Sequence, residues 1–447
     1  MEICAKELNF YGDILIKNLS KTVTLFTDSV INDLLSQIPY KHSLTVQKMA
    51  KPYDYICLPQ NKENCFNTFC PLVVNPRHSI ALSAHRLMIK FIPFLMQDVI
   101  QTTEVLDREE EENLLSPPKT ILSLLEQMDG IIDTMLSEYL IGDCICVVEA
   151  DTDSFTYTLG YLLLWTQILE IFGQLSDEMK PQLTAFLRQS SYLSRLLENL
   201  FRLMPLSATD VNAIDGQWLS TTTINEWTES LVDQRLESTH IQRLSTHLYY
   251  LILRRLPASV RQWWNNCDRK TADAVNKYTA SYFSGVLCAQ ELEAVQRADI
   301  TQFKNMAVKA RPQAREVVAN YTIEEITIEL LIQLPANHPL GPVGIDSGRR
   351  VGVSGTQWRT WLLQLTTFLT HQNGSILDGL ILWKKNIDKR FEGVDECMIC
   401  FYVLHGQTCQ LPRLQCKYCK KRYHSACLYR WFNTSNNSTC PNCRNLF

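Results

Sequence analysis

The C-terminal end of the chain contains four pairs of potential metal ligands, and two residues separate the members of each pair. In chain order, the pairs are Cys397 and Cys400, Cys416 and Cys419, His424 and Cys427, and Cys440 and Cys443. A two-residue gap allows a tight backbone turn to direct both donors at one metal ion, which is why this spacing recurs in structural zinc sites. Eight ligands suffice for two closed tetrahedral sites, so we predict two structural Zn²⁺ ions that activate no water.

The ligand order is four cysteines, one histidine and three cysteines, and it allows either sequential or interleaved pairing with two metals. Spacing alone does not choose between these arrangements. The apolar content around the ligands is low for a free-standing module. Metal binding would therefore supply much of the folding free energy, on the order of 10 kcal/mol per zinc. Cys409 falls outside the pairs, and it is either a loop thiol or a competing ligand.

Charge is distributed unevenly along the 447 residues. The formal net charge is −4, but residues 383–447 carry eleven Lys or Arg against four Asp or Glu, which leaves −11 for the remainder. A basic segment indicates either an anionic partner or a solvated surface. The length is sufficient for two or three domains, and the hydrophobic fraction of 46% is ordinary for a globular protein.

The other cysteines are scattered over the chain before the ligand pairs, and the chain opens without a basic-then-apolar signal sequence. Together with the zinc pattern, this indicates a reducing compartment and predicts a cytosolic protein. The longest uncharged apolar stretch, residues 155–169, is too short to cross a bilayer, so no membrane contact is expected. Residues 51–77 contain three cysteines but no Cys-x-x-Cys pair, which favours a loop over a third metal site. An acidic run at 109–112 predicts an exposed loop.

Residues 1–300 are predicted to be mainly α-helical. The clearest helix spans residues 120–140, where apolar side chains recur every three or four residues at Ile121, Leu125, Met128, Ile132, Met135 and Tyr139. Ser116 is expected to cap this helix, with Pro117 in its first turn. Further helices are predicted over residues 159–175, 183–203, 241–256 and 272–292. They predict an irregular α-solenoid of HEAT or armadillo type, although the sequence has no clean repeat consensus.

A small α+β domain is predicted over residues 310–391. Its first strand follows from an alternation of apolar and polar residues that begins at Ile326. Its predicted elements are strands over residues 326–334 and 344–353, a proline-rich turn between them, and helices over residues 358–370 and 376–391. Asn373 and Gly374 separate the two helices. Strands, a turn and then helices are typical of an α+β fold.

The residues between the ligands distinguish two zinc-binding families with this ligand order, RING-type ubiquitin ligases and PHD fingers. Ile399 inside the first pair, Trp431 after the third pair and Pro441 inside the fourth resemble the apolar trio with which RING domains hold a ubiquitin-conjugating enzyme. Arg444 matches the RING position that bridges this enzyme and its bound ubiquitin. A PHD finger usually has an aromatic residue where this chain has Ser438. The pattern favours a RING over residues 395–447.

A closer resemblance, to the listerin family, extends over residues 261–447. It is carried by the ligand segments and by unusual runs at residues 261–266, 321–324, 332–335, 369–375 and 388–393. Listerin chains are much longer helical-repeat proteins that end in an RWD domain and a RING, so the resemblance is to their C-terminal portion. It implies that residues 310–391 form the RWD domain, a relative of the conjugating-enzyme fold. No cysteine occurs between Cys288 and Cys397, so this segment cannot form a thioester.

The resemblance implies an E3 ubiquitin ligase of ribosome-associated quality control. The RING would recruit a ubiquitin-charged conjugating enzyme and promote transfer to lysines of stalled nascent chains on 60S ribosomal subunits, with the basic segment near ribosomal RNA. No residue of this chain would be a catalytic nucleophile. Ile399, Trp431 and Pro441 would dock the enzyme, and Arg444 would orient ubiquitin. The two zinc sites are then predicted to interleave, with one ion on Cys397, Cys400, His424 and Cys427 and the other on Cys416, Cys419, Cys440 and Cys443.

Two alternatives stay open at this point. One is a non-catalytic zinc adaptor that binds a protein or the ribosome, and auto-ubiquitylation with purified conjugating enzymes would separate it from a ligase. The other is a nucleic-acid-binding zinc finger, motivated by the basic residues Lys417, Lys420, Lys421 and Arg422. A steep salt dependence of binding to generic RNA would favour this second alternative.

Overall fold

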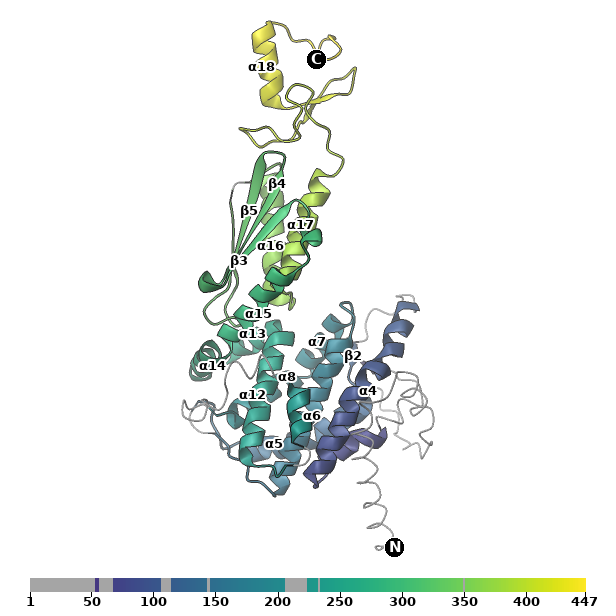
Figure 1. Cartoon of the computed structure of the whole chain (residues 1–447), viewed down its shortest axis with the longest axis vertical. Helices are drawn as coiled ribbons and strands as arrows, with labels where there is room; N and C mark the ends of the chain where they lie inside the picture. Colours follow the sequence, from purple (N-terminus) through teal and green to yellow (C-terminus); the bar gives the residue numbers. More distant parts are fainter. Residues whose placement is uncertain are drawn as a thin grey trace. The chain divides into compact units, whose positions relative to one another are not determined.

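The computed structural model describes residues 53–55, 67–105, 114–142, 145–205, 223–231, 234–348 and 350–447. The chain divides into two compact units, Met1–Tyr278 and Thr279–Phe447. The first unit is helical, and the second combines a sheet, helices and the segment with the ligand pairs (Figure 1). The acidic run at 109–112, and Cys57 and Cys65, lie outside the described residues. No helix in the described part of the chain has the length and apolar character needed to cross a membrane.

The first unit is an array of helices around α6. Its elements in chain order are β1 (Tyr53–Tyr55), η2 (Cys70–Val74), α4 (His78–Val105), β2 (Leu114–Ser116), α5 (Lys119–Leu136), α6 (Asp153–Gln174), α7 (Lys180–Gln189), α8 (Tyr192–Leu203), α11 (Ile224–Ser230), α12 (Ser238–Arg255), α13 (Pro257–Asn266) and most of α14 (Arg269–Tyr282), whose last four residues belong to the second unit. The Thr152 side chain caps α6 by accepting the backbone N–H of Phe155 at 3.1 Å. The helix is buried nearly all round and packs against α4, α5 and α12, as expected of a helix in a protein interior.

The helix predicted over residues 120–140 is α5, but its predicted cap is wrong. Ser116 ends β2, and the backbone at the N-cap position is that of Pro118, which has no side-chain cap. Residues that precede a proline are driven into extended backbone, so Pro117 and Pro118 hold Ser116 outside the helix. The buried side chains of α5 repeat with the predicted spacing as far as Ile132.

Two predicted long helices are each a pair of shorter ones. The segment 183–203 divides into α7 and α8, because Ser191 takes a left-handed backbone with φ of 60°. The segment 272–292 divides between α14 and α15 (Ser284–Arg297) at Phe283, which is completely buried. The Ser284 hydroxyl there donates to the backbone oxygen of His338 at 2.6 Å. In both cases the apolar period continues across the break, so periodicity does not reveal it.

The second unit contains an antiparallel four-stranded sheet in the order β3-β4-β5-β6. Its elements after α15 are η3 (Ile300–Phe303), β3 (Met306–Arg311), η4 (Pro312–Ala314), β4 (Glu316–Ile323), β5 (Ile326–Gln333), β6 (Gly344–Ser347), α16 (Gly355–His371), α17 (Ile376–Phe391), β7 (Leu414–Gln415), β8 (Arg422–Tyr423) and α18 (Ser425–Ser435). Helices α16 and α17 lie along one face of the sheet (Figure 1). We call the sheet with α15, α16 and α17 the α+β segment, and residues 395–447 the Cys/His segment.

The α+β segment confirms the predicted strand at Ile326 and both predicted helices. Ile328, Leu330 and Ile332 are completely buried, and the intervening side chains face outward. Ser354 and Ser375 cap α16 and α17, and α17 has the predicted bounds. The strand predicted over residues 344–353 is shorter, since only Gly344–Ser347 pairs with β5. Strands β3 and β4 were not predicted. In β4 the residues 317–319 are buried in succession, and in β3 the exposed positions include the apolar Ala307, so neither sequence shows a clear apolar–polar alternation.

Two buried clusters stabilise the second unit. The larger one joins the inner face of the sheet to α15, α16 and α17, and it also includes Leu404, Cys409 and Leu411 of the Cys/His segment. The smaller one lies within the Cys/His segment and consists of Cys397, Cys416, Tyr423, Cys427, Leu428 and Cys440. The Cys/His segment is therefore divided between a core of its own and the core of the α+β segment.

Candidate metal centres

The structure brings all eight predicted ligands into two groups of four. The first cluster is Cys397, Cys400, His424 and Cys427, and the second cluster is Cys416, Cys419, Cys440 and Cys443. Within each cluster, the candidate ligand atoms lie within 4.8 Å of one another. The pairing is interleaved, since the first and third pairs share one cluster and the second and fourth pairs share the other. Each cluster therefore fits one metal ion.

The short β7–β8 hairpin explains this pairing. Leu414 pairs with Tyr423 and Gln415 pairs with Arg422. Cys416 therefore lies at the turn end of the hairpin, directly after β7, and His424 lies at its open end, directly after β8. The second ligand pair thus occupies the hairpin turn, while His424 leads directly into α18. Because the two strands run in opposite directions, ligands adjacent in sequence are delivered to different clusters.

Three of the ligand pairs are built on the same backbone turn. The residue after the second cysteine has a left-handed backbone in each, with φ of 59° at Phe401, 59° at Lys420 and 62° at Arg444. Its N–H donates to the carbonyl of the pair's first cysteine, at 2.7, 3.1 and 2.9 Å respectively. The fourth pair lies instead on the first turn of α18, where the Leu428 N–H donates to the carbonyl of His424 at 2.9 Å. Backbone geometry thus orients the donor atoms toward each cluster without the help of a metal ion.

His424 is held in the form that a metal requires. Its Nδ1 atom lies 3.3 Å from the Cys400 Sγ and 3.8 Å from the Cys427 Sγ, so it faces the cluster. Its Nε2 atom lies 3.1 Å from the Val403 carbonyl oxygen and donates its hydrogen there. This arrangement leaves the Nδ1 lone pair for a metal ion. Burial lowers the pKa of His424 below its usual value, which keeps the ring neutral.

Each cluster contains at least one thiol with a lowered pKa, which favours metal binding because cysteine binds metals as the thiolate. The backbone N–H of Lys421 lowers the pKa of Cys419 to about 6. At Cys397, burial opposes ionisation, but backbone N–H groups, led by that of His424, outweigh it and lower the pKa. Each cluster therefore contains a thiol that loses its proton readily. Cys409 belongs to neither cluster, because it is buried in the core of the α+β segment and behaves as a loop thiol.

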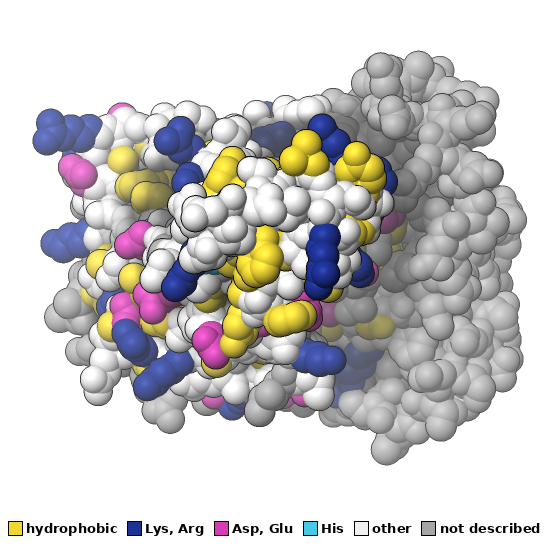
Figure 2. Space-filling view, turned by 90° about the horizontal axis from the view of Figure 1, so that it is seen from above, with side chains coloured by type: hydrophobic (Ala, Val, Ile, Leu, Met, Phe, Trp, Pro, Cys, Tyr) yellow, Lys and Arg dark blue, Asp and Glu magenta, His cyan; other side chains and the backbone are white. Residues whose placement is uncertain are grey.

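The four residues predicted to contact a conjugating enzyme and ubiquitin all keep access to solvent. Ile399 and Pro441 are half-buried, Arg444 is exposed, and the Trp431 side chain on α18 is 39% exposed despite its size. Other large apolar side chains of the Cys/His segment are exposed as well, namely Phe401, Tyr402, Tyr418, Tyr429 and Leu446. In the view of Figure 2, exposed hydrophobic side chains lie between Lys and Arg side chains. A surface of this composition is typical of protein interaction sites.

Sequence reasoning missed the groups that support the ligands from outside. The Tyr423 hydroxyl is buried and lies 3.1 Å from the Cys440 Sγ. The Val403 carbonyl holds His424, and the Glu324 carboxylate accepts the Val403 N–H at 2.8 Å. A tyrosine directly before the histidine ligand is a local signal that could have indicated the first contact. The Glu324 contact joins residues far apart in the chain and has no such signal.

Comparison with known protein families identifies the helical region and the α+β segment. Residues 59–296 match the family description "LTN1 family HEAT repeat region", which covers more than half of the chain. Residues 306–390 match the description "Ubiquitin conjugating domain-like". The first unit is thus a HEAT-type helical region, and the sheet with its helices has the fold of a ubiquitin-conjugating domain. The two Cys/His clusters that follow are consistent with a RING.

Several curated relatives resemble nearly the whole chain. The "E3 ubiquitin-protein ligase listerin" of Mus musculus is 43% identical over 445 residues, which is 96% of this chain and 25% of the relative. The listerin of Gallus gallus is 41% identical over 94% of this chain, and that of Drosophila melanogaster is 33% identical over 99%. The chain spans about a quarter of the length of these relatives. On the evidence of its helical region, its conjugating-domain-like fold and its paired Cys/His clusters, the chain belongs to the listerin family.

Proposed function

We propose that this chain acts as a RING-type E3 ubiquitin ligase. The observation that carries the proposal is the interleaved pair of clusters, which holds Ile399 and Pro441 in separate ligand turns and Trp431 on α18, all accessible to solvent. The relatives' name, E3 ubiquitin-protein ligase listerin, supports the same activity. We propose the domain bounds as 1–300 for the helical region, 310–391 for the RWD-like domain and 395–447 for the RING.

We further propose that each cluster binds one Zn²⁺ ion. Three thiolates with one imidazole, and four thiolates, are donor sets of closed structural zinc sites. The orientation of His424 supports this assignment, because its Nε2 is occupied by Val403 and its Nδ1 faces the three thiols. Bound zinc would hold the ligand turns and α18 in place and would take no part in the transfer itself.

In the proposed mechanism, no residue of the RING acts as a nucleophile. Ubiquitin is carried as a thioester on a cysteine of the conjugating enzyme. A substrate lysine amine attacks the thioester carbonyl, so that an amide bond forms between the lysine and ubiquitin and the enzyme's cysteine leaves as a thiol. Ile399, Trp431 and Pro441 would hold the enzyme. Arg444 would hold ubiquitin in a closed arrangement, which lowers the entropic cost of the attack. The Arg444 N–H donates a hydrogen bond to the Cys440 carbonyl at 2.9 Å, which fixes the backbone of Arg444 for this role.

We propose lysines of stalled nascent chains on 60S ribosomal subunits as the target, within the ribosome-associated quality control complex of the cytosol. The basic charge of residues 383–447 supports a contact with ribosomal RNA, because phosphate groups attract Lys and Arg. The exposed cations Lys417, Lys420 and Lys421 lie on the hairpin turn of this segment. A non-catalytic adaptor with the same zinc sites is the alternative function.

Substitution of Trp431 tests the proposal. We expect Trp431→Ala to abolish ubiquitin transfer and to leave the zinc content unchanged, because the side chain is exposed and lies outside both clusters. The assay combines this chain, a panel of conjugating enzymes and purified 60S–nascent-chain complexes, and it records both nascent-chain modification and auto-ubiquitylation. Asn433→Ala, an exposed polar residue of the same helix, is the matched control. Wild-type activity of Trp431→Ala would contradict the docking role, and an inactive wild-type chain would favour the adaptor.

A further inference from the structure

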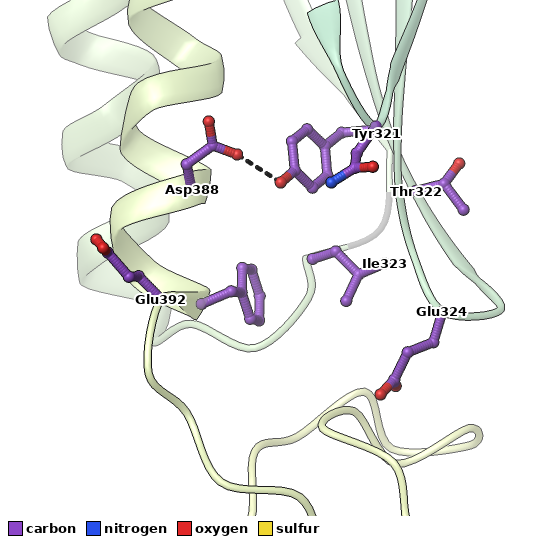
Figure 3. Close-up of a pocket in the computed structure, with 8 residues that line it drawn as sticks. Tyr321, Thr322, Ile323, Glu324, Asp388 and Glu392 are labelled. Atoms are coloured by element: carbon purple, nitrogen blue, oxygen red, sulfur yellow. Dashed lines mark hydrogen bonds between the residues drawn. The ribbon is translucent and has the colours of Figure 1, made fainter.

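We propose that Glu324, at the tip of the β4–β5 hairpin, is a positioning residue for the Cys/His segment. Its carboxylate fixes the loop that supports the first cluster, and it thereby sets the orientation of the Cys/His segment on the α+β segment. In Figure 3 the Glu324 side chain points away from the sheet and toward the adjoining loops. The consequence for ubiquitin transfer rests on the proposed function, whereas the structural role of Glu324 does not.

The two oxygens of Glu324 bind two successive backbone groups. One accepts the N–H of Val403 at 2.8 Å, and the other accepts the N–H of Leu404 at 3.3 Å. Hydrogen bonds to an ionised carboxylate are stronger than those between neutral groups. Glu324 has a left-handed backbone with φ of 54°, as the tight turn between Ile323 and Ile326 requires. The turn therefore presents the carboxylate as an acceptor for the loop.

Contacts between β4 and α17 hold the β4–β5 hairpin in place near Glu324. The Tyr321 hydroxyl donates to the Asp388 carboxylate at 2.5 Å, which ties β4 to α17 (Figure 3). Lys384 pairs with the same carboxylate at 2.5 Å. A cavity of about 540 Å³ lies beside these residues, and Glu324 and Glu392 also line it. The position of Glu324 is thus fixed by the sheet and α17 together.

The contact reaches the first cluster through one residue. Val403 donates its N–H to Glu324, and its carbonyl accepts the Nε2–H of His424 at 3.1 Å. Partners of this kind orient a histidine ligand and set its tautomer. Glu324 thereby supports a ligand of the first cluster.

The same loop is anchored in the α+β core at a second place. The Leu404 side chain is 1% exposed and packs in that core. The Gly352 N–H donates to the Cys409 carbonyl at 2.8 Å. A side chain at Gly352 would meet Phe391 at 2.6 Å and Leu404 at 3.2 Å, so the loop lies close against the backbone here. Glu324 and Gly352 thus hold the loop from both of its ends.

The covalent connection alone does not set this orientation. The chain leaves α17 at Phe391 and passes through Gly393, whose left-handed backbone has nothing within 4 Å of a side-chain position. A glycine in so short a connection permits backbone rotation, which the packing of Val394 against the α+β core partly limits. Non-covalent contacts must therefore contribute to the angle between the two segments, and the Glu324 carboxylate accepts two of the hydrogen bonds between them. A fixed angle between the two segments would hold a conjugating enzyme bound to the Cys/His segment at a constant distance from a partner of the α+β segment.

Two measurements on the full chain test the role of Glu324. The first is the rate of zinc transfer to a coloured chelator, for which we expect Glu324→Ala to release one of the two ions about 10-fold or more faster. The second is backbone hydrogen exchange, which should rise at residues 403–411 while β4 and β5 stay protected. Glu325→Ala is the matched control, because among the described residues this neighbour accepts one long hydrogen bond, from the exposed Tyr402 hydroxyl at 3.3 Å, and none from the backbone N–H groups that Glu324 binds.

Glu324→Gln covers the case in which the alanine variant disturbs the hairpin. It keeps the length of the side chain and one acceptor oxygen, so we expect a smaller effect in the same direction. Zinc release and exchange at residues 403–411 equal to the Glu325→Ala control, in both Glu324 variants, would overturn the proposal. Neither measurement contains a conjugating enzyme or ubiquitin. Failure here is therefore distinct from failure of the ligase proposal, which Trp431→Ala tests.

Discussion

The helical unit and the Cys/His segment are stabilised in different ways. In the helical unit, α6 alone buries Leu162, Leu163, Leu164 and Trp165 in succession, and the surrounding helices bury their own apolar faces against it. In the Cys/His segment, the buried cluster is mostly ligand cysteines, with Tyr423 and Leu428 as the large apolar members. The first region thus depends on hydrophobic burial, whereas the second would depend on the proposed metal binding.

Removal of zinc is the largest perturbation that separates the two regions. We expect a strong chelator to unfold the Cys/His segment, because each proposed zinc ion would contribute on the order of 10 kcal/mol to its folding. The helical unit should keep its structure. Backbone hydrogen exchange would show full exchange around α18 and continued protection of α6. Loss of protection in α6 would contradict independent stabilisation.

A cavity in the core of the helical unit is the converse perturbation. We expect Leu163→Ala to lower the free energy of unfolding of that unit by about 2–5 kcal/mol, because this side chain is completely buried. Zinc content should stay at the wild-type value. Denaturant unfolding followed by circular dichroism, with zinc measured in parallel, checks both expectations. Leu140→Ala is the matched control, because that side chain is 63% exposed and its loss should cost little.

Mild acidification is the smallest of these perturbations, and it is expected to lower the stability of the helical unit through a buried histidine. Burial lowers the pKa of His85 on α4 to about 3, and neither ring nitrogen has a hydrogen-bond partner among the described residues. In the unfolded chain a histidine titrates near 6.5, so the unfolded state binds the proton first. The contribution of neutral His85 is therefore complete above about pH 6.5 and is lost as the pH falls from there toward 3. The loss is about 1.4 kcal/mol per pH unit.

Substitution of this histidine should flatten the pH dependence. We expect His85→Leu, which is similar in size and carries no titrating group, to reduce the fall in the free energy of unfolding between pH 7 and pH 5. Circular dichroism follows the helical unit in this experiment. Equal slopes in the wild-type and variant chains would contradict the role of His85.

Periodicity predicted the elements but not where they break. The alternation from Ile326 and the apolar stripe of α5 describe local backbone repeats, which a sequence reveals directly. The breaks at Ser191 and Phe283 were missed, because the apolar period continues through them and packing against other helices decides the backbone there. Strand β4 was missed because both faces of part of it are buried, so its apolar residues do not alternate with polar ones. Strand β3 does alternate in burial, but its exposed Ala307 is apolar and hides the pattern in the sequence.

The sequence by itself determined which eight residues are the candidate ligands and which residues flank them, because a ligand pair with a two-residue gap is a local property of the chain. Spacing alone left the pairing of these ligands open, and the family resemblance predicted that the pairs interleave. The tertiary structure confirms that grouping and supplies its cause, since the β7–β8 hairpin sends neighbouring pairs to different clusters. It also decided that Glu324 supports the first cluster from the neighbouring segment. Contacts between residues so distant in the chain depend on packing of the whole unit, and no local spacing encodes them.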